Sequence, residues 1–258
     1  MPRLDPLVPD AELVVYLREA LAGLYSGEVH LPEPSGGREE GLKRLRAYSG
    51  KDYAARNELA GNVSRLSPYL RHGMLGLKET AEHARRTLKG KDRSEFLRQL
   101  AWKEFFSLVF WQQGDRILEN MEPPKYSAHW TPDLPEDLRE GQTGLPCVDA
   151  WVKRLKDTGY LHNHERLWFA AYTVHFRKVH WKAGYAFFRG HLLDGDVASN
   201  ALSWQWVAST FSSKPYIMNK DNIYRYSAAK WCSGCTADCP FHASYEALQD
   251  RLFGQRFS

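Results

Sequence analysis

LLDGDVASNALSWQWVAST, residues 192–210, places two carboxylates around a glycine and follows them with a run that carries Trp204 and Trp206. Taken alone, D-G-D indicates a turn with solvated carboxylates. Tryptophans at helical spacing are usually core residues. The function of this stretch therefore has to be inferred from the rest of the chain.

The rest of the chain has mostly helical patterning. Apolar residues at helical spacing predict helices over 10–25, 92–113, 148–157 and 167–182, although the β-branched and aromatic residues of the last one leave a strand as the alternative. Asp92 and Glu95 resemble a capping box at the start of the second helix, and Thr158 with Gly159 is expected to end the third. Because no alternating strands or βαβ rhythm occur, the predicted class is all-α. A Gly/Pro/Glu-rich stretch over 26–40 predicts a linker, which divides the chain into 1–40 and 41–258.

The composition is that of a globular protein. The chain has 258 residues, 43% hydrophobic and 26% charged, which suits one large domain and excludes wholesale disorder and a disulfide-stapled miniprotein. No stretch approaches eighteen consecutive apolar residues, so no membrane span is predicted. Asp5, Asp10 and Glu12 stand where a signal peptide needs basic and apolar residues, so we expect a cytoplasmic protein.

Four further stretches combine with the first one. They are SRLSPYLRHG at 64–73, QLAWKEFF at 99–106, TGLPCVDAWVKRL at 143–155 and TGYLHNHERLW at 158–168. Together the five resemble the C-terminal, flavin-binding half of the photolyase/cryptochrome family. The resemblance implies an all-α domain that binds FAD in a U-shaped pocket. Since nothing here matches the family's N-terminal α/β antenna domain, we expect a stand-alone FAD-binding domain.

The resemblance also implies which residues hold FAD. The phosphates fall to Tyr53, Ser64, Arg65, Leu66 and Ser67, and small hydroxyls, helix-start N–H groups and a guanidinium suit a pyrophosphate. Without the other motifs, S-R-L-S-P would indicate an ordinary helix start with Pro at its first position. The remaining expected FAD-binding residues are Gln99, Lys103, Asn163, Arg166, Asp194, Asp196 and Asn200.

Several of these residues have individual roles in the family. The Arg166–Asp194 pair would flank the isoalloxazine, and Asn200 would face its N5 atom; carboxylate, guanidinium and amide groups are suited to tuning a flavin. Lys103 replaces the family's usual Arg, so a bidentate contact becomes a point-charge contact. Gln99 stands where repair enzymes often contact the lesion.

Five positions are expected to take part in chemistry: Asn200, Trp204, Trp181, Trp206 and Trp102. Trp204 and Trp181 match the first two members of the family's photoreduction relay. The third, surface position is assigned to Leu138, which would break the relay. The alternatives left open are Trp130, Tyr160, Trp168, Tyr172 and the cysteine site.

Trp206 and Trp102 match the aromatic residues that stack against a flipped-out lesion, which offsets part of the unstacking cost. Leu167 replaces the family's methionine and His164 one of its arginines. These two differences count against repair.

Four cysteines form a candidate metal site. Cys232, Cys235 and Cys239 follow a C-x2-C-x3-C-P pattern like the last part of a bacterial ferredoxin motif, and Cys147 is the fourth. Zinc also accepts four thiolates, and unligated thiols or a redox pair remain alternatives. The C-terminal stretch resembles the bacterial branch of the family that carries a [4Fe–4S] cluster, although those relatives usually have a longer loop before the last cysteine. The resemblance therefore favours an iron–sulfur cluster over zinc.

Charge points to a phosphate-rich partner. Residues 151–230 carry twelve Lys and Arg against five Asp and Glu, and a basic region favours a polyanion by counterion release. Charge alone, however, favours a solvated face on a mildly basic protein. We expect DNA as the partner and light-driven electron transfer from reduced FAD to a pyrimidine lesion as the function. A cryptochrome-like light or redox sensor with a protein partner and a light-independent flavin/iron–sulfur electron-transfer protein are the alternatives.

Overall fold

The computed structural model describes residues 4–5, 7–25 and 35–257. It is 57% helical with no strand in these ranges, which confirms the predicted all-α class. The chain divides into two units, Met1–Gly36 and Gly37–Ser258. Most of the predicted linker, residues 26–34, lies outside the described residues. Within the described part of the chain, no helix has the length and apolar composition needed to cross a membrane.

The first unit contains one described helix, α1 (Asp10–Ala20). It ends five residues earlier than the predicted helix over 10–25, because the backbone leaves helical geometry at Leu21.

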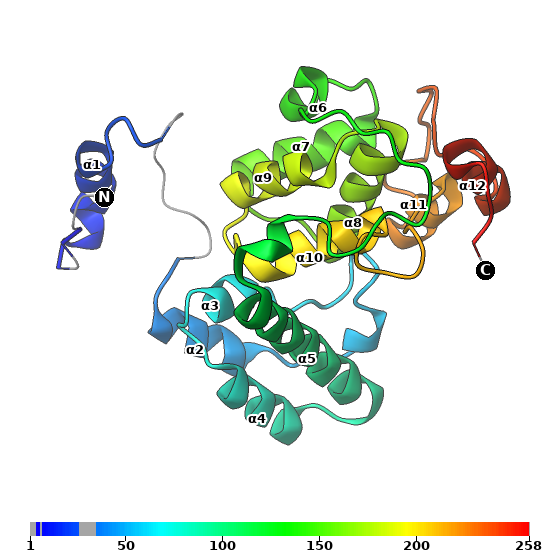
Figure 1. Ribbon diagram of the computed structural model, residues 1–258. Helices are drawn as coiled ribbons and strands as arrows, with labels where there is room; N and C mark the ends of the chain where they lie inside the picture. The colour runs from blue at the N-terminus through cyan, green and yellow to red at the C-terminus, as the bar shows by residue number, and fades with distance from the viewer. Residues whose placement is uncertain (1–3, 6, 26–34, 258) are drawn as a thin grey trace. The chain divides into compact units, whose positions relative to one another are not determined.

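The second unit, which we call the main body, contains all other elements (Figure 1). They are α2 (Arg38–Ala47), η1 (Tyr53–Ala55), α3 (Ser67–Arg71), α4 (Leu77–Thr87), α5 (Gly90–Gln113), η2 (Gly114–Leu118), α6 (Glu136–Glu140), α7 (Pro146–Thr158), α8 (Asn163–Ala171), the π-helical turn η3 (Tyr172–Phe176), α9 (Trp181–His191), α10 (Val197–Ala208), α11 (Lys220–Tyr226) and α12 (Tyr245–Phe253).

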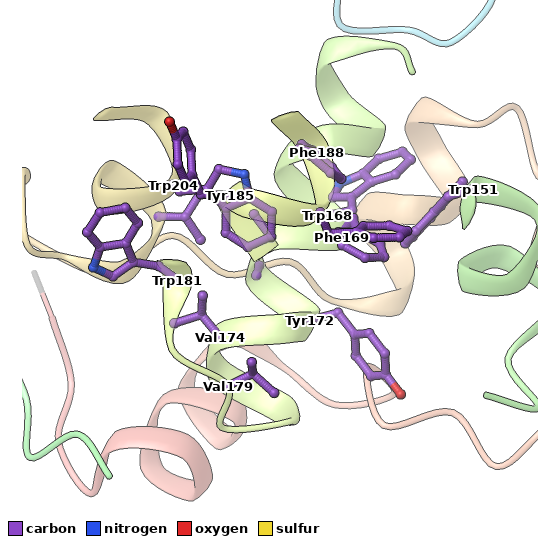
Figure 2. Packing of buried hydrophobic residues seen from close by; sticks show 14 of the residues in the cluster. Trp151, Trp168, Phe169, Tyr172, Val174, Val179, Trp181, Tyr185, Phe188 and Trp204 are labelled. Carbon is purple, nitrogen blue, oxygen red and sulfur yellow. The ribbon is translucent and has the colours of Figure 1, made fainter. Parts of the chain in front are cut away.

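Two apolar clusters hold the main body together. The larger one is built mainly by α7–α11 around Trp151, Trp168 and Trp181, each with no exposed surface (Figure 2). The smaller one joins α2, α3, α4 and α5. Helix α5 also packs against α10 and so connects the two groups of helices. A ligand bound between α5 and α10 therefore lies between the two groups of helices.

Two of the helix predictions for this region are confirmed. Helix α7 ends at Thr158 and is followed by Gly159 in the left-handed conformation, as the sequence indicates. Helix α5 covers the predicted 92–113. Its start is different, however: the Asp92 carboxylate accepts from the backbone N–H groups of Asp52 and Ala54 instead of capping the helix. The predicted capping box was wrong because the Asp92 carboxylate is hydrogen-bonded to a loop that is distant in sequence.

The single helix predicted over 167–182 was also wrong. The chain forms α8, the π-helical turn η3 and then α9, with Lys178 in the left-handed conformation and His180 capping α9. At the break, Val179 forms a single parallel bridge to Thr131. This tertiary pairing outweighs a continuous helical pattern, and neither Gly nor Pro marks the break in the sequence.

Candidate functional site: a two-compartment pocket

A cavity with two adjoining compartments lies between α3, α5, α8, α9 and α10. The larger compartment measures about 300 Å³ and the second about 210 Å³. Volumes of this order are typical of small-molecule sites. The residues that line both compartments are Tyr53, Ser64, Ser67, Gln99, Asn163, Arg166 and Asp194.

The larger compartment is apolar and aromatic on one side and polar on the other. Phe106, Leu167 and Trp204 line it together with Lys103 and Asn200. Apolar walls with a few placed polar groups suit a flat, heteroatom-containing ring.

The second compartment is built for an anion. Arg56, Arg65 and Arg166 line it together with Ser64 and Ser67. Because Arg56 pairs with Glu95 and Arg166 with Asp194, Arg65 is the one of the three that pairs with no carboxylate in the described structure. Arg65 has a φ of 52°, a left-handed conformation that is uncommon for a non-glycine residue, and its guanidinium lies 4.8 Å from the centre of the Tyr160 ring. Cations and small hydroxyls together are the donors that a phosphate group requires.

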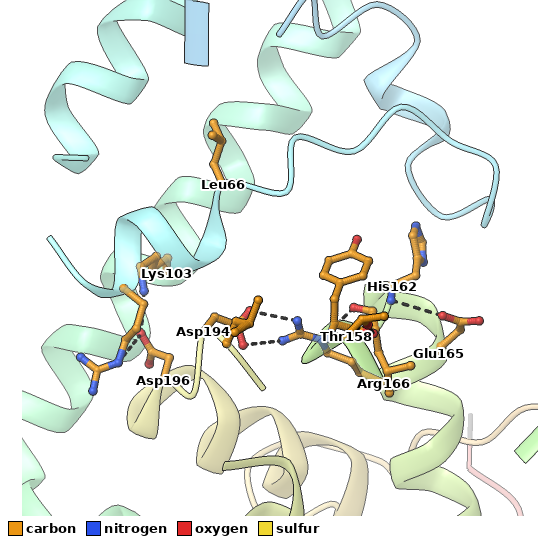
Figure 3. Close-up of polar contacts among 12 residues, drawn as sticks. Leu66, Lys103, Thr158, His162, Glu165, Arg166, Asp194 and Asp196 are labelled. Atoms are coloured by element: carbon orange, nitrogen blue, oxygen red, sulfur yellow. Dashed lines mark hydrogen bonds and ion pairs between the residues drawn. The ribbon is translucent and has the colours of Figure 1, made fainter. Parts of the chain in front are cut away.

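Arg166 and Asp194 form the central ion pair of the pocket (Figure 3). The Arg166 Nη1 and Nη2 atoms donate to the two Asp194 carboxylate oxygens at 3.2 and 2.9 Å, and Arg166 Nε donates to the carbonyl of Leu161. Burial acts to raise the pKa of Asp194, but the Arg166 charge and hydrogen bonds from Arg166 and Ser67 outweigh it and hold the pKa below its usual value. Asp194 therefore stays ionised although it is buried.

Lys103 and Asp196 form a second pair in the larger compartment. Lys103 Nζ lies 2.6 Å from Asp196 Oδ2, and the other carboxylate oxygen accepts from the N–H of Ser199 as the N-cap of α10. Burial alone would raise the pKa of Asp196, but these hydrogen bonds and the Lys103 charge lower it. Asp196 thus fixes both the start of α10 and the Lys103 ammonium.

The side chain of His162 fixes the start of α8, which supplies Asn163 and Arg166. His162 Nδ1 accepts from the N–H of His164, while Glu165 accepts from the N–H of His162, a reciprocal capping box. Glu165 also accepts two hydrogen bonds from Arg154, at 2.7 and 2.8 Å. Burial, followed by the neighbouring His164, lowers the pKa of His162 to about 4, so the cap stays neutral and can accept. The sequence did not indicate this cap because histidine is not a usual N-cap residue.

Two residues of α10 face α9. Asn200 Nδ2 donates to the carbonyl of Tyr185, which leaves its amide oxygen as the group it can offer to a ligand. The Trp204 ring lies so close to Gly184 that a Cβ there would be 2.1 Å from Cη2 of Trp204. Gly184 is therefore required for α9 and α10 to pack with Trp204 between them.

The structure brings every predicted FAD-binding residue to this pocket. Besides the seven shared residues, Lys103, Asp196 and Asn200 line the larger compartment, and Arg65 and Leu66 the second. Trp102 and Trp204 also line the larger compartment, whereas Trp206 and Trp181 do not. Two lining residues that the sequence analysis missed, Phe106 and Ser203, could have been found by helical spacing, because each lies three residues after a predicted one, Lys103 and Asn200 respectively. Tyr160 was considered only as a relay residue.

The predicted third relay position was wrong. Leu138 is fully buried in the larger core and is not a surface residue. Trp130 is the aromatic residue that continues from Trp181: their rings are joined through His180, at centroid distances of 5.6 and 5.1 Å. Trp130 itself is partly exposed. The three rings thus form a contiguous aromatic path that starts in the core.

The four cysteines gather at one place outside the pocket. Cys147, Cys232 and Cys239 pack against the larger core, and the electrostatic influence of Cys239 and Cys232 reaches Cys147. Burial, as the largest cause, raises the pKa of Cys147 to about 12. All four are partly exposed free thiols, and within the described ranges no three His, Cys, Asp or Glu side chains are arranged to hold a metal ion. The structure supports convergence of the four residues but not a completed metal site.

An all-helical body with an aromatic compartment joined to an anion-binding compartment defines a protein that binds a large phosphorylated ring cofactor. Residues 96–236 match the model of the FAD binding domain of DNA photolyase. The chain belongs to this family and is a FAD-binding, photolyase-like protein.

Individual relatives agree with this assignment. The chain is 36% identical over 165 residues to a deoxyribodipyrimidine photo-lyase of Halobacterium salinarum, covering 60% of this chain and 34% of that protein. It is 35% identical over 213 residues to a deoxyribodipyrimidine photo-lyase of Streptomyces griseus, covering 80% of this chain and 43% of that one. The chain therefore spans less than half the length of these relatives.

Solved structures show the same fold. The Synechocystis sp. PCC6803 cryptochrome matches with a TM-score of 0.71 at 24% identity, covering 87% of this chain and 48% of that one. The archaeal photolyase from Sulfolobus tokodaii matches with a TM-score of 0.66 at 30% identity, covering 77% and 46%.

Proposed function

We propose that the chain is a light-driven repair flavoprotein, in which light-excited reduced FAD donates an electron to a pyrimidine lesion in DNA. One observation carries the proposal: the aromatic compartment adjoins an anion compartment, as a flavin dinucleotide requires. The names of the relatives in Halobacterium salinarum and Streptomyces griseus support the choice of lesion.

The residues of this chain would hold and tune the cofactor. The serine hydroxyls and the Arg56 and Arg65 guanidiniums would bind the pyrophosphate, while the Arg166–Asp194 pair would fix the electrostatics beside the ring. The amide oxygen of Asn200 suits a protonated ring nitrogen, because its NH2 group is already bonded to Tyr185. Bound FAD would supply the light absorption and the transferable electron.

Two exposed tryptophans offer aromatic surface for a flipped base, one lining the larger compartment and one on the helix that borders it. Trp102 lines the larger compartment and is 50% exposed, and Trp206 on α10 is 41% exposed. We infer that these two rings stack against the lesion, since each stacked base contributes about 1–3 kcal/mol.

We infer that Trp204, Trp181 and Trp130 carry electrons to the flavin during photoreduction. Trp204 lines the pocket, Trp181 lies on the adjoining helix α9, and His180 joins Trp181 to Trp130. Trp130, one of the alternatives left open by the sequence, would thus take the third position, which the sequence had assigned to the non-aromatic Leu138.

The test uses full-length protein loaded with reduced FAD and an oligonucleotide that contains a cyclobutane pyrimidine dimer. Under blue light we expect the dimer to disappear, with no loss in the dark. Trp206→Ala should weaken dimer binding, whereas Tyr224→Ala, which removes another exposed ring outside the pocket, should not. A flavin-loaded protein that leaves the dimer intact under light would refute repair.

One observation favours a cryptochrome-like sensor as the second candidate. His164, which replaces an arginine of the repair enzymes, is buried: its ring lies 4.8 Å from that of Trp168 and 4.5 Å from that of Tyr226, and its Nδ1 lies 2.6 Å from the Asn57 carbonyl oxygen. It is therefore not available to a DNA phosphate. Light-dependent flavin reduction without dimer loss would support the sensor and contradict repair.

We also propose that the four cysteines bind a [4Fe–4S] cluster, as in the iron–sulfur branch of the family. Support comes from their convergence and from thiolate being the usual ligand of such clusters. In a four-iron cluster each thiolate binds a different iron, so the sulfurs lie farther apart than around a single ion. Cys235→Ala should remove iron and lower stability, and Ser233→Ala in the same loop should do neither. Stoichiometric zinc without iron in the native protein would overturn the cluster.

A further inference from the structure

The corner between α4 and α5 carries five exposed cations that form no ion pair in the described structure. We define this α4–α5 corner by Arg85, Arg86, Lys89, Lys91 and Arg93. In the described part of the chain, none of their side chains forms a hydrogen bond or an ion pair. In Figure 1 the corner lies where α4 passes into α5, at the end of α5 away from η2.

In the described structure the carboxylates nearby form no ion pair with these five cations. Asp92, the acidic residue inside the corner, accepts from the N–H groups of Asp52 and Ala54, at 3.1 and 2.8 Å. Glu95 is shared between Arg56 and Arg98. Glu82 lies one turn before Arg86 but forms no ion pair with it in the described structure. With five cations against the carboxylates of Glu82 and Asp92, the corner carries a net positive charge.

In the basic segment 151–230, by contrast, half of the twelve cations form ion pairs in the described structure. Six of its cations pair with carboxylates, several of which lie outside the segment. They are Lys153, Arg154, Lys156, Arg166, Arg177 and Lys182. Counting charge along the sequence therefore overstates the unpaired positive charge of this segment.

A line of exposed residues leads from the corner to the pocket mouth along α5. Lys91, Arg98 and Trp102 are separated by seven and four residues, so they lie on one face of the helix, and all three are exposed. From Lys91 to Trp102 the helix rises about 16 Å, which is about five base-pair steps of a duplex. The pocket mouth and the corner are thus close enough for one nucleic acid strand to reach both.

We propose that the α4–α5 corner binds the phosphate backbone of DNA whose damaged base lies at the pocket mouth. This inference rests on the proposed function for the position of the lesion. The ordered line ending at an exposed aromatic residue favours DNA over an acidic polypeptide, which would need no such ring. The corner acts without reading sequence, because its contacts would all be to phosphates.

The test is the salt dependence of binding to undamaged duplex DNA in the dark, which needs no repair chemistry. The quadruple variant replaces four of the five corner cations, Arg85, Arg86, Lys89 and Lys91, with glutamine. The matched control replaces four cations that are already paired, at Lys153, Lys156, Lys182 and Arg256. Flavin absorbance of every variant verifies that the pocket is intact.

We expect the corner variant to bind duplex more weakly, with a slope of log K against log salt that is shallower by about three to four units. The control variant should keep the wild-type slope. Equal slopes for the corner variant and wild type would overturn the inference. It would also be overturned if the corner variant bound polyglutamate more weakly than wild type but bound duplex DNA equally well. If the wild type failed to repair the dimer while the corner variant still showed the shallower slope, the proposed function would be refuted and the DNA-binding role of the corner would stand.

Discussion

Arg166 donates hydrogen bonds to both carboxylate oxygens of Asp194, and this pair joins α8 to the segment before α10 across 28 residues of sequence. Asp194 is buried and lines both compartments. Removal of either partner leaves a buried charge without compensation, which is more costly than the pair itself is stabilising.

Arg166→Ala is therefore expected to lower the free energy of unfolding by about 3 kcal/mol and to abolish co-purification of flavin. Denaturant unfolding and the flavin absorbance per protein measure the two effects. The control is Arg256→Ala, which removes the arginine of an exposed pair with Asp250 and should change neither. Full flavin content in Arg166→Ala would show that this pair does not hold the cofactor.

Acid should weaken the protein through Asp194. Because its pKa is lower in the folded state, its stabilising contribution is complete above the ordinary carboxyl value of 3.8 and is lost as the pH falls through the folded value. Asp194→Asn should be less stable than wild type at neutral pH, with the difference shrinking below that value. Unfolding free energies measured across this pH range test the prediction, and a difference that grows in acid would contradict it.

Gly184→Ala tests the packing of Trp204. The new methyl group would overlap the indole, so the free energy of unfolding should fall by about 1–3 kcal/mol. A Cβ at Gly190, on the same helix, would meet no atom within 4 Å, so Gly190→Ala should instead stabilise the helix by about 0.5–1 kcal/mol. Equal effects at the two glycines would mean that α9 and α10 do not pack as closely as described.

Trp130→Phe should largely prevent light-dependent reduction of the flavin while leaving its binding unchanged. The reason is that Trp130 ends the aromatic path from Trp181 through His180. Trp151→Phe changes another tryptophan of the same core and serves as the control. If both variants photoreduce at the wild-type rate, electrons follow another path.

The sequence predicted the helical class and the lining of the pocket because both depend on local patterns and on motifs. It failed where distant contacts decide. Asp92 looked like a cap but binds the loop at Asp52, and Val179 breaks a helix by pairing with Thr131. Leu138 was matched to a surface position that breaks the relay, but tertiary packing buries it. The ion pairs of six cations in residues 151–230 could not be inferred from composition either.

The most direct measurement is the absorption spectrum of anaerobically purified full-length protein, taken in the dark and again after blue light. We predict flavin bands that bleach under illumination in the wild type and are missing from Arg166→Ala. A wild-type spectrum without flavin bands, from protein that is folded and supplied with FAD, would contradict the assignment of the pocket.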